Sequence, residues 1–364
     1  MASTTMPGHT VSLGELRRAA EPHFGGKSAN LGELLASGIP VPPGFAISAG
    51  AFGLFLEENG LRERVSEVLR ELDADDVKGL RSVSGELYRL ICSAPLPEAL
   101  EGEILRRYRE IAGAAGEENP PVAVRSSAIG EDSEQATFAG QQKTYLWVRG
   151  AESVCEAVRK CWASLYSPEA LSYRARMAAA GSEPAMGVTV QMMVDAEVAG
   201  VMFTCNPLSG DPSTVAVNAS WGLGEAVVAG EVTPDEYRLS KVTGEVLHRS
   251  IGRKHLEYRP DPASAGVRTV EVEPERQEIS CLEEEHLRAL VEVARRVERH
   301  FGTHQDIEWA LARGRGLPDA LFVVQSRPVT TVRRRGGEPP RARSAIELVM
   351  GTFGVVSDEE RGRS

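Results

Sequence analysis

The sequence lacks several features that mark specialised classes of protein. No run of apolar residues approaches the roughly 18 that a membrane-spanning helix needs. The stretch from Met1 to Leu16 has no signal-peptide core. The five cysteines are odd in number and no two stand in a CxxC pair, so neither a disulfide framework nor a zinc site is indicated. We therefore expect a cytoplasmic protein in a reducing compartment, with no membrane partner.

An excess of positive charge is also missing. Lysine and arginine total 41 against 52 aspartate and glutamate residues, which gives a formal net charge of −11. A general nucleic-acid binder would show a basic excess, so we expect no nucleic-acid partner. This balance is compatible with ATP, because a phosphate site needs only a few local cations and backbone donors. A chain of 364 residues predicts two or three lobes.

The pattern of apolar residues and turn signals divides the chain into four segments. We expect a mostly helical lobe, a small α/β lobe, a larger sheet lobe and a flexible basic tail, at residues 10–118, 119–195, 196–331 and 332–364 respectively. The tail is rich in arginine, glycine and proline, and a linker that docks on a partner is the alternative interpretation. Helical and sheet lobes in this order predict an α+β fold with a cleft between lobes, where nucleotides commonly bind.

A glycine-rich turn, Gly25-Gly26-Lys27-Ser28, opens the first clear helical pattern. It is not a P-loop, because Glu21 stands where that motif requires its first glycine. A lysine at the start of a helix still presents a cation and free amides to an anion. The simpler alternative is a surface lysine beside a turn.

Two later segments are candidates for contact with phosphate. Arg125 directly follows a predicted strand, and arginine can donate two parallel hydrogen bonds to a phosphate. The loop at residues 136–141 contains Gly140 and is small enough to close over a triphosphate, with its amides as donors. Neither signal is specific by itself, because a lone arginine after a strand usually forms a surface salt bridge.

Two predicted strands near the end carry polar residues at alternate positions. Asp306 and Glu308 are two apart, so they face the same side of one strand, and Gln325 and Arg327 do so on the other. If the strands pair, two carboxylates, an amide and a guanidinium converge. Such oxygen ligands suit Mg²⁺ carrying phosphate oxygens, and arginine can stabilise a transferred phosphoryl group. The alternative is an exposed sheet face with one salt bridge.

Five ordered blocks, from about Gly25 to Thr330, resemble the nucleotide-binding domain of the phosphoenolpyruvate synthase and pyruvate phosphate dikinase family. They are GGKSANLGELLASGIPVPPGFAIS (25–48), VAVRSSAIGEDSEQATFAGQQKTYLWVRG (122–150), MFTCNPLSGD (202–211), ASWGLGEAVVAGEVTPDEY (219–237) and QDIEWA…VVQSRPVT (305–330). The resemblance implies an ATP-grasp-type fold, and ATP and Mg²⁺ as cofactors. One small departure is Ser28, which stands where the family usually has asparagine.

The resemblance implies a role for each of five residues before position 200. Lys27 and Arg125 match phosphate-contacting cations and are candidate catalytic residues. Gly140 and Thr144 match the closing loop and its following strand, which hold the triphosphate. Gln191 matches the segment that meets the adenine.

The resemblance also implies roles for the paired-strand residues. Glu308 and Gln325 match magnesium ligands, with Asp306 beside them. Arg327 matches the last phosphate-binding arginine and is a third candidate catalytic residue. Glu308 and Gln325 therefore belong to both the nucleotide site and the metal site.

In this family ATP phosphorylates a histidine in a Gly-rich Thr-Ser-His-type motif on a separate domain. None of the seven histidines here has that context. We therefore expect the ATP component of a dikinase, whose partners are a phosphohistidine-domain protein and an acceptor-binding subunit on separate chains. Phenylphosphate synthase resembles this arrangement. The alternatives are a rifamycin-phosphotransferase-related ATP domain and a non-catalytic module that senses ATP.

Overall fold

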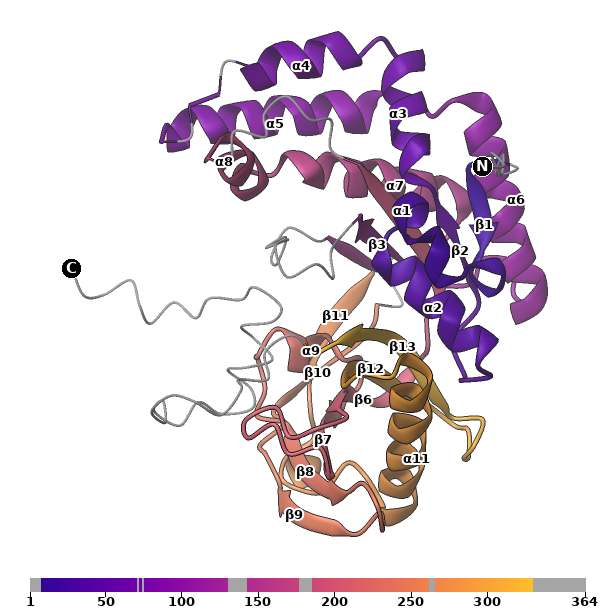
Figure 1. Cartoon of the computed structure of the whole chain (residues 1–364), viewed down its shortest axis with the longest axis vertical. Coiled ribbons are helices and arrows are strands. Elements are labelled where there is room, and N and C mark those ends of the chain that lie inside the picture. The colour runs from indigo at the N-terminus through magenta and orange to yellow at the C-terminus, as the bar shows by residue number, and fades with distance from the viewer. Residues whose placement is uncertain are drawn as a thin grey trace. The chain divides into compact units, whose positions relative to one another are not determined.

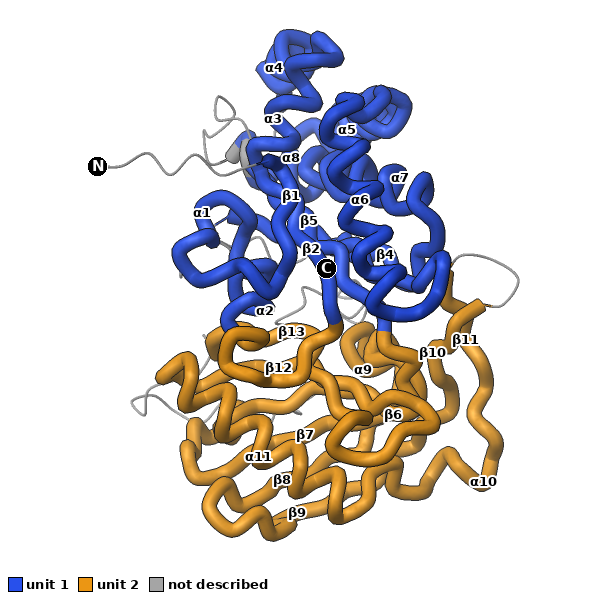
Figure 2. The backbone as a smooth tube through the Cα atoms, turned by 90° about the vertical axis from the view of Figure 1, so that its right-hand side faces the viewer, with its two compact units in different colours: residues 1–33, 43–193 blue, residues 34–42, 194–364 orange. Residues whose placement is uncertain are grey.

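The computed structural model describes residues 8–70, 72–73, 75–129, 143–176, 185–261 and 266–329. The chain divides into two compact units (Figure 2). Unit 1 comprises residues 1–33 and 43–193, and unit 2 comprises residues 34–42 and 194–364. Each unit has its own antiparallel sheet and its own helices.

Unit 1 contains a five-stranded antiparallel sheet with the strand order β1-β2-β5-β3-β4. Three of its strands, β1, β2 and β3, are labelled in Figure 1. Its strands are β1 (Thr10–Ser12), β2 (Gly44–Ile47), β3 (Val122–Ala128), β4 (Thr144–Val148) and β5 (Met186–Met192). The strands alternate between two environments, because successive side chains point to opposite faces. Val124, Val188 and Val190 are fully buried in an apolar core, whereas Arg125, Thr189 and Gln191 lie on the other face.

Eight α-helices begin in unit 1 among the described residues. They are α1 (Glu21–Phe24), α2 (Gly26–Ala36), α3 (Ala49–Glu58), α4 (Arg62–Arg70), α5 (Val77–Ser93), α6 (Glu98–Ala115), α7 (Ala151–Ala163) and α8 (Pro168–Arg176). Three 3₁₀ turns accompany them at Leu13–Glu15, Arg18–Ala20 and Ser164–Tyr166. Helices α1 to α6 all lie within residues 10–118, the segment for which the sequence predicts a mostly helical lobe.

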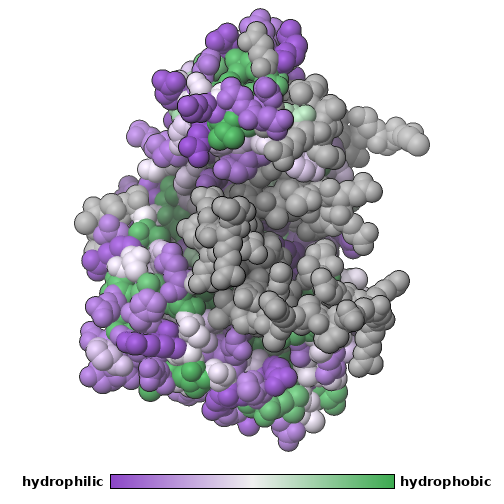
Figure 3. Space-filling view, turned by 90° about the vertical axis from the view of Figure 1, so that its left-hand side faces the viewer, coloured by the Kyte–Doolittle hydropathy of each residue, from purple (hydrophilic) through white to green (hydrophobic). Residues whose placement is uncertain are grey.

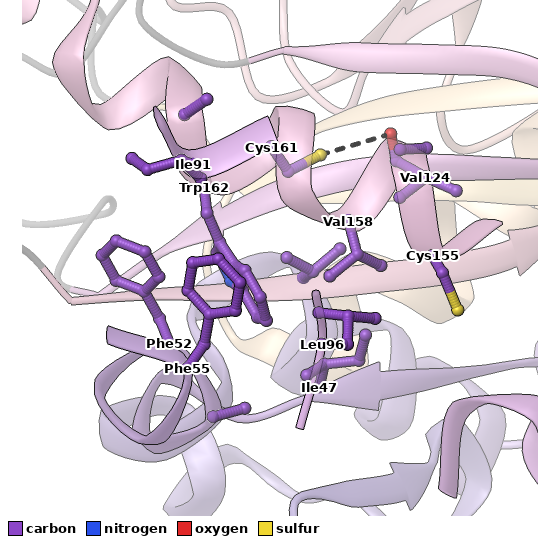
Figure 4. Close-up of a cluster of buried hydrophobic side chains, with 14 of the residues drawn as sticks. Ile47, Phe52, Phe55, Ile91, Leu96, Val124, Cys155, Val158, Cys161 and Trp162 are labelled. Atoms are coloured by element: carbon purple, nitrogen blue, oxygen red, sulfur yellow. Dashed lines mark hydrogen bonds between the residues drawn. The ribbon is translucent and has the colours of Figure 1, made fainter. Parts of the chain in front are cut away.

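An aromatic cluster joins the helices of unit 1 to its sheet (Figure 4). The ring of Trp162 on α7 lies 5.4 Å from Phe52 and 5.2 Å from Phe55 on α3, measured between centroids. Aromatic pairs at such distances add to the free energy gained by burying their surface. The thiol of Cys161, next along α7, donates a weak hydrogen bond to the carbonyl of Val124 at 3.8 Å.

The sheet of unit 1 draws strands from both of the first two predicted lobes. The sequence predicts a mostly helical segment up to residue 118, yet β1 and β2 lie in this segment and pair into the sheet. β2 pairs with one edge of β5, and β3 pairs with the other edge. Helices from both segments share one core because they cover the same sheet face. The three-lobe division remains a prediction.

Unit 2 contains a six-stranded antiparallel sheet with the order β13-β12-β6-β7-β8-β9. Its strands are β6 (Ala196–Phe203), β7 (Thr214–Trp221), β8 (Asp235–Ser240), β9 (Val246–Ser250), β12 (Gln305–Ala312) and β13 (Leu321–Pro328). A separate hairpin joins β10 (Leu256–Pro260) to β11 (Val267–Glu271). The helices are α9 (Glu225–Val228), α10 (Pro274–Gln277) and α11 (Glu284–Phe301). The α+β class predicted from the sequence is confirmed.

Helix α11 supplies the main apolar helix surface of unit 2. Its buried residues recur at helical spacing and include Leu287, Leu290, Ala294 and Val297, and the helix packs along β12. A capping box between Glu283 and His286 begins it, and Gly302 ends it in a left-handed conformation at φ 70°.

A buried ion pair ties the strands of unit 2 to its loops. Asp235 on β8 and Lys254 are both fully buried and hydrogen bonded to each other. The Lys254 ammonium also donates to the carbonyl of Gly252 at 2.8 Å. The carboxylate accepts further bonds from the amides of Gly252 and Cys281, at 3.1 and 2.8 Å. Because the charges are paired and hydrogen bonded, their burial is sustainable.

The surface drawn in Figure 3 mixes polar and apolar residues, without one large apolar patch among those that are coloured. The large apolar side chains that are exposed in the described part of the chain include Leu208, Val242, Leu247 and Ile279. No described helix is long and apolar enough to span a bilayer. All five cysteines are free thiols, and four of them are buried.

Asp235→Ala should destabilise unit 2 strongly, because it leaves the Lys254 ammonium buried without its counter-ion. We expect a loss of about 3–5 kcal/mol in unfolding free energy, measured by chemical denaturation. Glu292→Ala is the matched control, since it breaks an exposed ion pair with Arg295 and should cost less than about 1 kcal/mol. Similar losses in the two variants would contradict this assignment.

Candidate functional site

Three of the predicted residues in unit 1 lie on one face of its sheet. Arg125 on β3 is opposite both Thr144 on β4 and Thr189 on β5 in the strand register. Gln191 is two residues beyond Thr189 and therefore points to the same side. This face is the one that the apolar core of unit 1 does not use. The register thus brings Arg125, Thr144 and Gln191 together.

Gln191 is 2% exposed, and its Nε2 atom has no hydrogen-bond partner among the described residues. A buried donor without an acceptor costs about 1–3 kcal/mol. Natural proteins seldom accept that cost unless a ligand or water supplies the acceptor. The buried amide is therefore consistent with a side chain whose partner is a ligand.

The turn that carries Lys27 lies against the same strands. Gly25 has φ 79°, a conformation that side chains other than glycine rarely adopt, and its α-carbon is packed against the Ser127 backbone. Gly187 on β5 similarly packs against the carbonyl of Phe24. Lys27 itself is half-buried at the start of α2. A helix start with a lysine beside an arginine-bearing strand is an arrangement suited to anions.

The four predicted residues of unit 2 lie on the paired strands β12 and β13. In the antiparallel register, Asp306 is directly opposite Arg327 and Glu308 is directly opposite Gln325. The strand pairing on which the sequence prediction depended is confirmed. Arg327 Nε donates a hydrogen bond to Asp306 Oδ2 at 2.9 Å. We call these four residues the carboxylate set.

A β-bulge next to the carboxylate set changes the phase of β13. Glu308 pairs with Gln325, but the next residue, Trp309, pairs with Val323, so Val324 is the extra residue. Val323 therefore shares the side of Trp309, and both are almost completely buried. Without the bulge, Val323 would face the same side as Gln325. The bulge lets β13 contribute to the core and to the carboxylate set within a few residues.

Burial raises the pKa of Asp306 above its usual 3.8. The Arg327 guanidinium opposes this rise through its charge and its hydrogen bond, while the nearby Glu308 adds to it. Asp306 is 5% exposed, and its Oδ1 atom has no hydrogen-bond partner among the described residues. An unsatisfied buried carboxylate oxygen is a natural acceptor for a cation or a donor.

The donor set of these strands suits a hard divalent cation. Carboxylate oxygens of Asp306 and Glu308 and the amide oxygen of Gln325 share one sheet face, and such oxygens are the ligands that Mg²⁺ prefers. The described residues contain no cluster of three or more histidine, cysteine or acidic side chains that would hold a metal by themselves. Besides these two carboxylates, a metal ion here would therefore need the amide oxygen of Gln325, water molecules and oxygen atoms of a bound phosphate as ligands.

The remaining predicted residue, Gly140, lies outside the described part of the chain, as does the loop at 136–141. Sequence reasoning missed two residues that the structure places beneath the Lys27 turn, Ser127 and Thr189. A signal for Ser127 was present, because it is two residues after Arg125 on a predicted strand and so faces the same side. The same signal was present for Thr189, which is two residues before the candidate Gln191 and so faces the same side of β5.

The family model for the pyruvate phosphate dikinase AMP/ATP-binding domain matches residues 21–347. The chain belongs to this family. A probable phosphoenolpyruvate synthase of Methanothermobacter thermautotrophicus is 44% identical over 310 residues, which cover 85% of this chain and 44% of that protein. The phosphoenolpyruvate synthase of Pyrococcus furiosus is 38% identical over 388 residues, covering 96% of this chain and 47% of that protein.

The chain therefore spans less than half the length of these curated relatives. Among solved structures, D-alanyl-alanine synthetase A from Vibrio cholerae matches with a TM-score of 0.28 and 12% identity, over 82% of this chain and 54% of that one. The family is thus established by sequence over most of the chain, and the roles of individual residues remain predictions.

Arg327→Ala should destabilise unit 2 more at neutral than at acidic pH. The guanidinium holds the pKa of Asp306 down, so its loss raises that pKa further above 3.8. A carboxyl group whose pKa is raised by folding contributes stability that is fully present below its unfolded-state pKa. This contribution is lost as the pH rises through its folded-state pKa. Denaturation should show a larger loss at about pH 7 than at about pH 4.

The control for this prediction is Arg313→Ala. It breaks a more exposed ion pair with Asp195, at 3.8 Å, and should show little pH dependence. An Arg327→Ala penalty that stays constant across this pH range would show that the ion pair with Asp306 is not what the arginine contributes.

Proposed function

We propose that this chain is the ATP-binding component of a phosphoenolpyruvate-synthase-like dikinase. It would pass phosphate from ATP to a histidine on a separate chain or domain, with AMP and phosphate as by-products. The observation that carries the proposal is the carboxylate set, in which Asp306 holds Arg327 directly beside Glu308 and Gln325. Membership of a family described as AMP/ATP-binding supports it.

The chain's cations would bind and orient the triphosphate. Lys27 and Arg125 in unit 1 and Arg327 in unit 2 are the candidate catalytic residues. The hydrogen bond from Arg327 Nε to Asp306 fixes the plane of the guanidinium before any ligand arrives. A preorganised donor stabilises developing charge on a phosphoryl group at little reorganisation cost. Thr144 and Gln191 share the sheet face of Arg125 and would contact the nucleotide beside it.

Glu308 and Gln325, with Asp306 beside them, would hold Mg²⁺. The ion would neutralise charge on the phosphate oxygens when bound. Burial raises the pKa of Asp306, and a neighbouring cation would oppose this rise, because a positive charge favours the ionised carboxylate. Asp306 binds the Arg327 guanidinium through Oδ2, and its Oδ1, which has no hydrogen-bond partner among the described residues, would be available to the cation.

The nucleophile would come from another polypeptide or domain. The 364 residues contain seven histidines, none in a Gly-rich Thr-Ser-His-type motif, at positions His9, His23, His248, His255, His286, His300 and His304. In the proposed reaction, an imidazole nitrogen forms a bond to the β-phosphorus of ATP and AMP leaves. Water then releases the terminal phosphate, and the phosphohistidine phosphorylates the acceptor. Covalent relay of this kind splits one difficult transfer into easier steps.

Glu308→Ala should weaken the binding of ATP with Mg²⁺. A charge-assisted contact is worth roughly 1.5–3 kcal/mol, so we expect an affinity loss of about tenfold or more by calorimetry. Glu292→Ala removes an exposed carboxylate on α11 and should bind ATP normally. Unchanged affinity in Glu308→Ala would remove this residue from the site.

A second test concerns the product. The 364-residue chain alone should hydrolyse ATP slowly, because orientation of a nucleophile accounts for roughly 7–11 kcal/mol of barrier lowering. With a partner that carries the Thr-Ser-His-type motif, it should release AMP and label the partner's histidine from β-labelled ATP. Arg327→Ala should abolish the labelling. Efficient phosphorylation of an acceptor by this chain alone, with ADP as the product, would refute the proposal.

A further inference from the structure

Three hydroxyl side chains lie beneath the turn that carries Lys27. Ser28, Ser127 and Thr189 are all completely buried. They come from α2, β3 and β5, which are distant in sequence. None of them can reach solvent, and none has a role in the chemistry proposed above. We call them the hydroxyl cluster.

The hydroxyl cluster is joined by hydrogen bonds. Ser28 Oγ and Thr189 Oγ1 are 2.6 Å apart, so one donates to the other. The backbone amide of Ser28 donates to Ser127 Oγ at 3.3 Å. Ser28 is therefore bonded to both strands, through its side chain and through its backbone.

The bond from the Ser28 amide satisfies a need of helix α2. The first four amides of a helix have no carbonyl partner within the helix, and a side chain near the start usually caps them. α2 begins at Gly26 and is preceded by Gly25, and neither residue has a side chain for this purpose. The acceptor comes instead from Ser127, which is 99 residues away in sequence. The start of α2 is thereby fixed to β3.

Both anchoring residues are close neighbours of Arg125. Ser127 is two residues beyond Arg125 on β3, on the same side of the strand. Thr189 is directly opposite Arg125 in the register of β3 with β5. The close packing of Gly25 on Ser127 and of Phe24 on Gly187 leaves no space for the turn to shift toward the strands. The backbone of the turn that carries Lys27 is therefore anchored to β3 and β5, next to Arg125 in the strand register, by the hydroxyl cluster together with this glycine packing.

We propose that Ser127 and Thr189 are positioning residues, which hold Lys27 beside Arg125 so that the two cations can bind the phosphates of ATP together. They act through Lys27 and do not touch the nucleotide. This inference rests on the proposed function, and it adds that affinity for the phosphates is set by buried neutral hydroxyls behind the charged residues. A rigid supporting shell of this kind is what fixes the geometry of a functional site.

The first test compares ligands with and without phosphate. Ser127→Ala and Thr189→Val should each weaken ATP binding by about threefold to tenfold in calorimetry. Binding of adenosine, which has the base and ribose alone, should be unchanged. Thr189→Ser keeps the hydroxyl and should keep the affinity for ATP. Ser164→Ala is the control, because it removes another buried hydroxyl of unit 1, bonded to the Cys161 carbonyl at 2.6 Å, and should bind ATP normally.

The second test is a double-mutant cycle with Lys27→Ala. If Ser127 acts through Lys27, Ser127→Ala should have no further effect on ATP affinity once the lysine is absent. A full additional loss in the double variant would show that Ser127 acts by another route. Equal losses for ATP and adenosine would show a general disturbance of unit 1, and unchanged ATP affinity in Ser127→Ala would equally overturn the inference. Absence of ATP binding by the unsubstituted chain would instead refute the proposed function, and this inference with it.

Discussion

The antiparallel pairing of β12 with β13 is the constraint on which the carboxylate set depends. Four polar side chains from two segments converge only because Asp306 is opposite Arg327 and Glu308 is opposite Gln325. A slip of one residue would move the whole set of one strand to the other face. The apolar residues between them, Ile307 and Trp309, oppose such a slip because they are buried on the other side. Core packing and site geometry are therefore specified by the same register.

Unit 1 uses a different device to place its cations. The position of Arg125 follows from the strand register. Lys27 instead lies on a turn that is attached to the sheet through glycine packing and the hydroxyl cluster. The charged residues are partly accessible, whereas the groups that orient them are neutral and buried. Neutral hydroxyls can be buried at low cost when they bond to each other, which a second layer of charges could not do.

The sequence was informative where a periodic pattern carried the signal. The two polar strands around Asp306 and Arg327 follow from residue spacing alone, and the family follows from the five ordered sequence blocks. Strands β1 and β2 were not predicted, because they are three and four residues long and β2 follows a proline-rich run. The pairing of Ser28 with Thr189 spans 161 residues, so no local rule could reveal it. The bulge at Val324 was not predicted, because the order of polar and apolar residues in β13 does not reveal where an extra residue interrupts the pairing with β12.

That bulge has a consequence for how the β12–β13 hairpin tolerates change in length. Between Glu308 and the tip, the pairing of Trp309 with Val323 belongs to the core, and toward the strand ends the pairing of Asp306 with Arg327 belongs to the carboxylate set. The extra residue, Val324, shifts the alternation of side chains between the two faces of β13, so that it differs on the two sides of the bulge. Deletion of Val324 would therefore break one of the two pairings, so β13 serves both the core and the polar face only while this extra residue is kept.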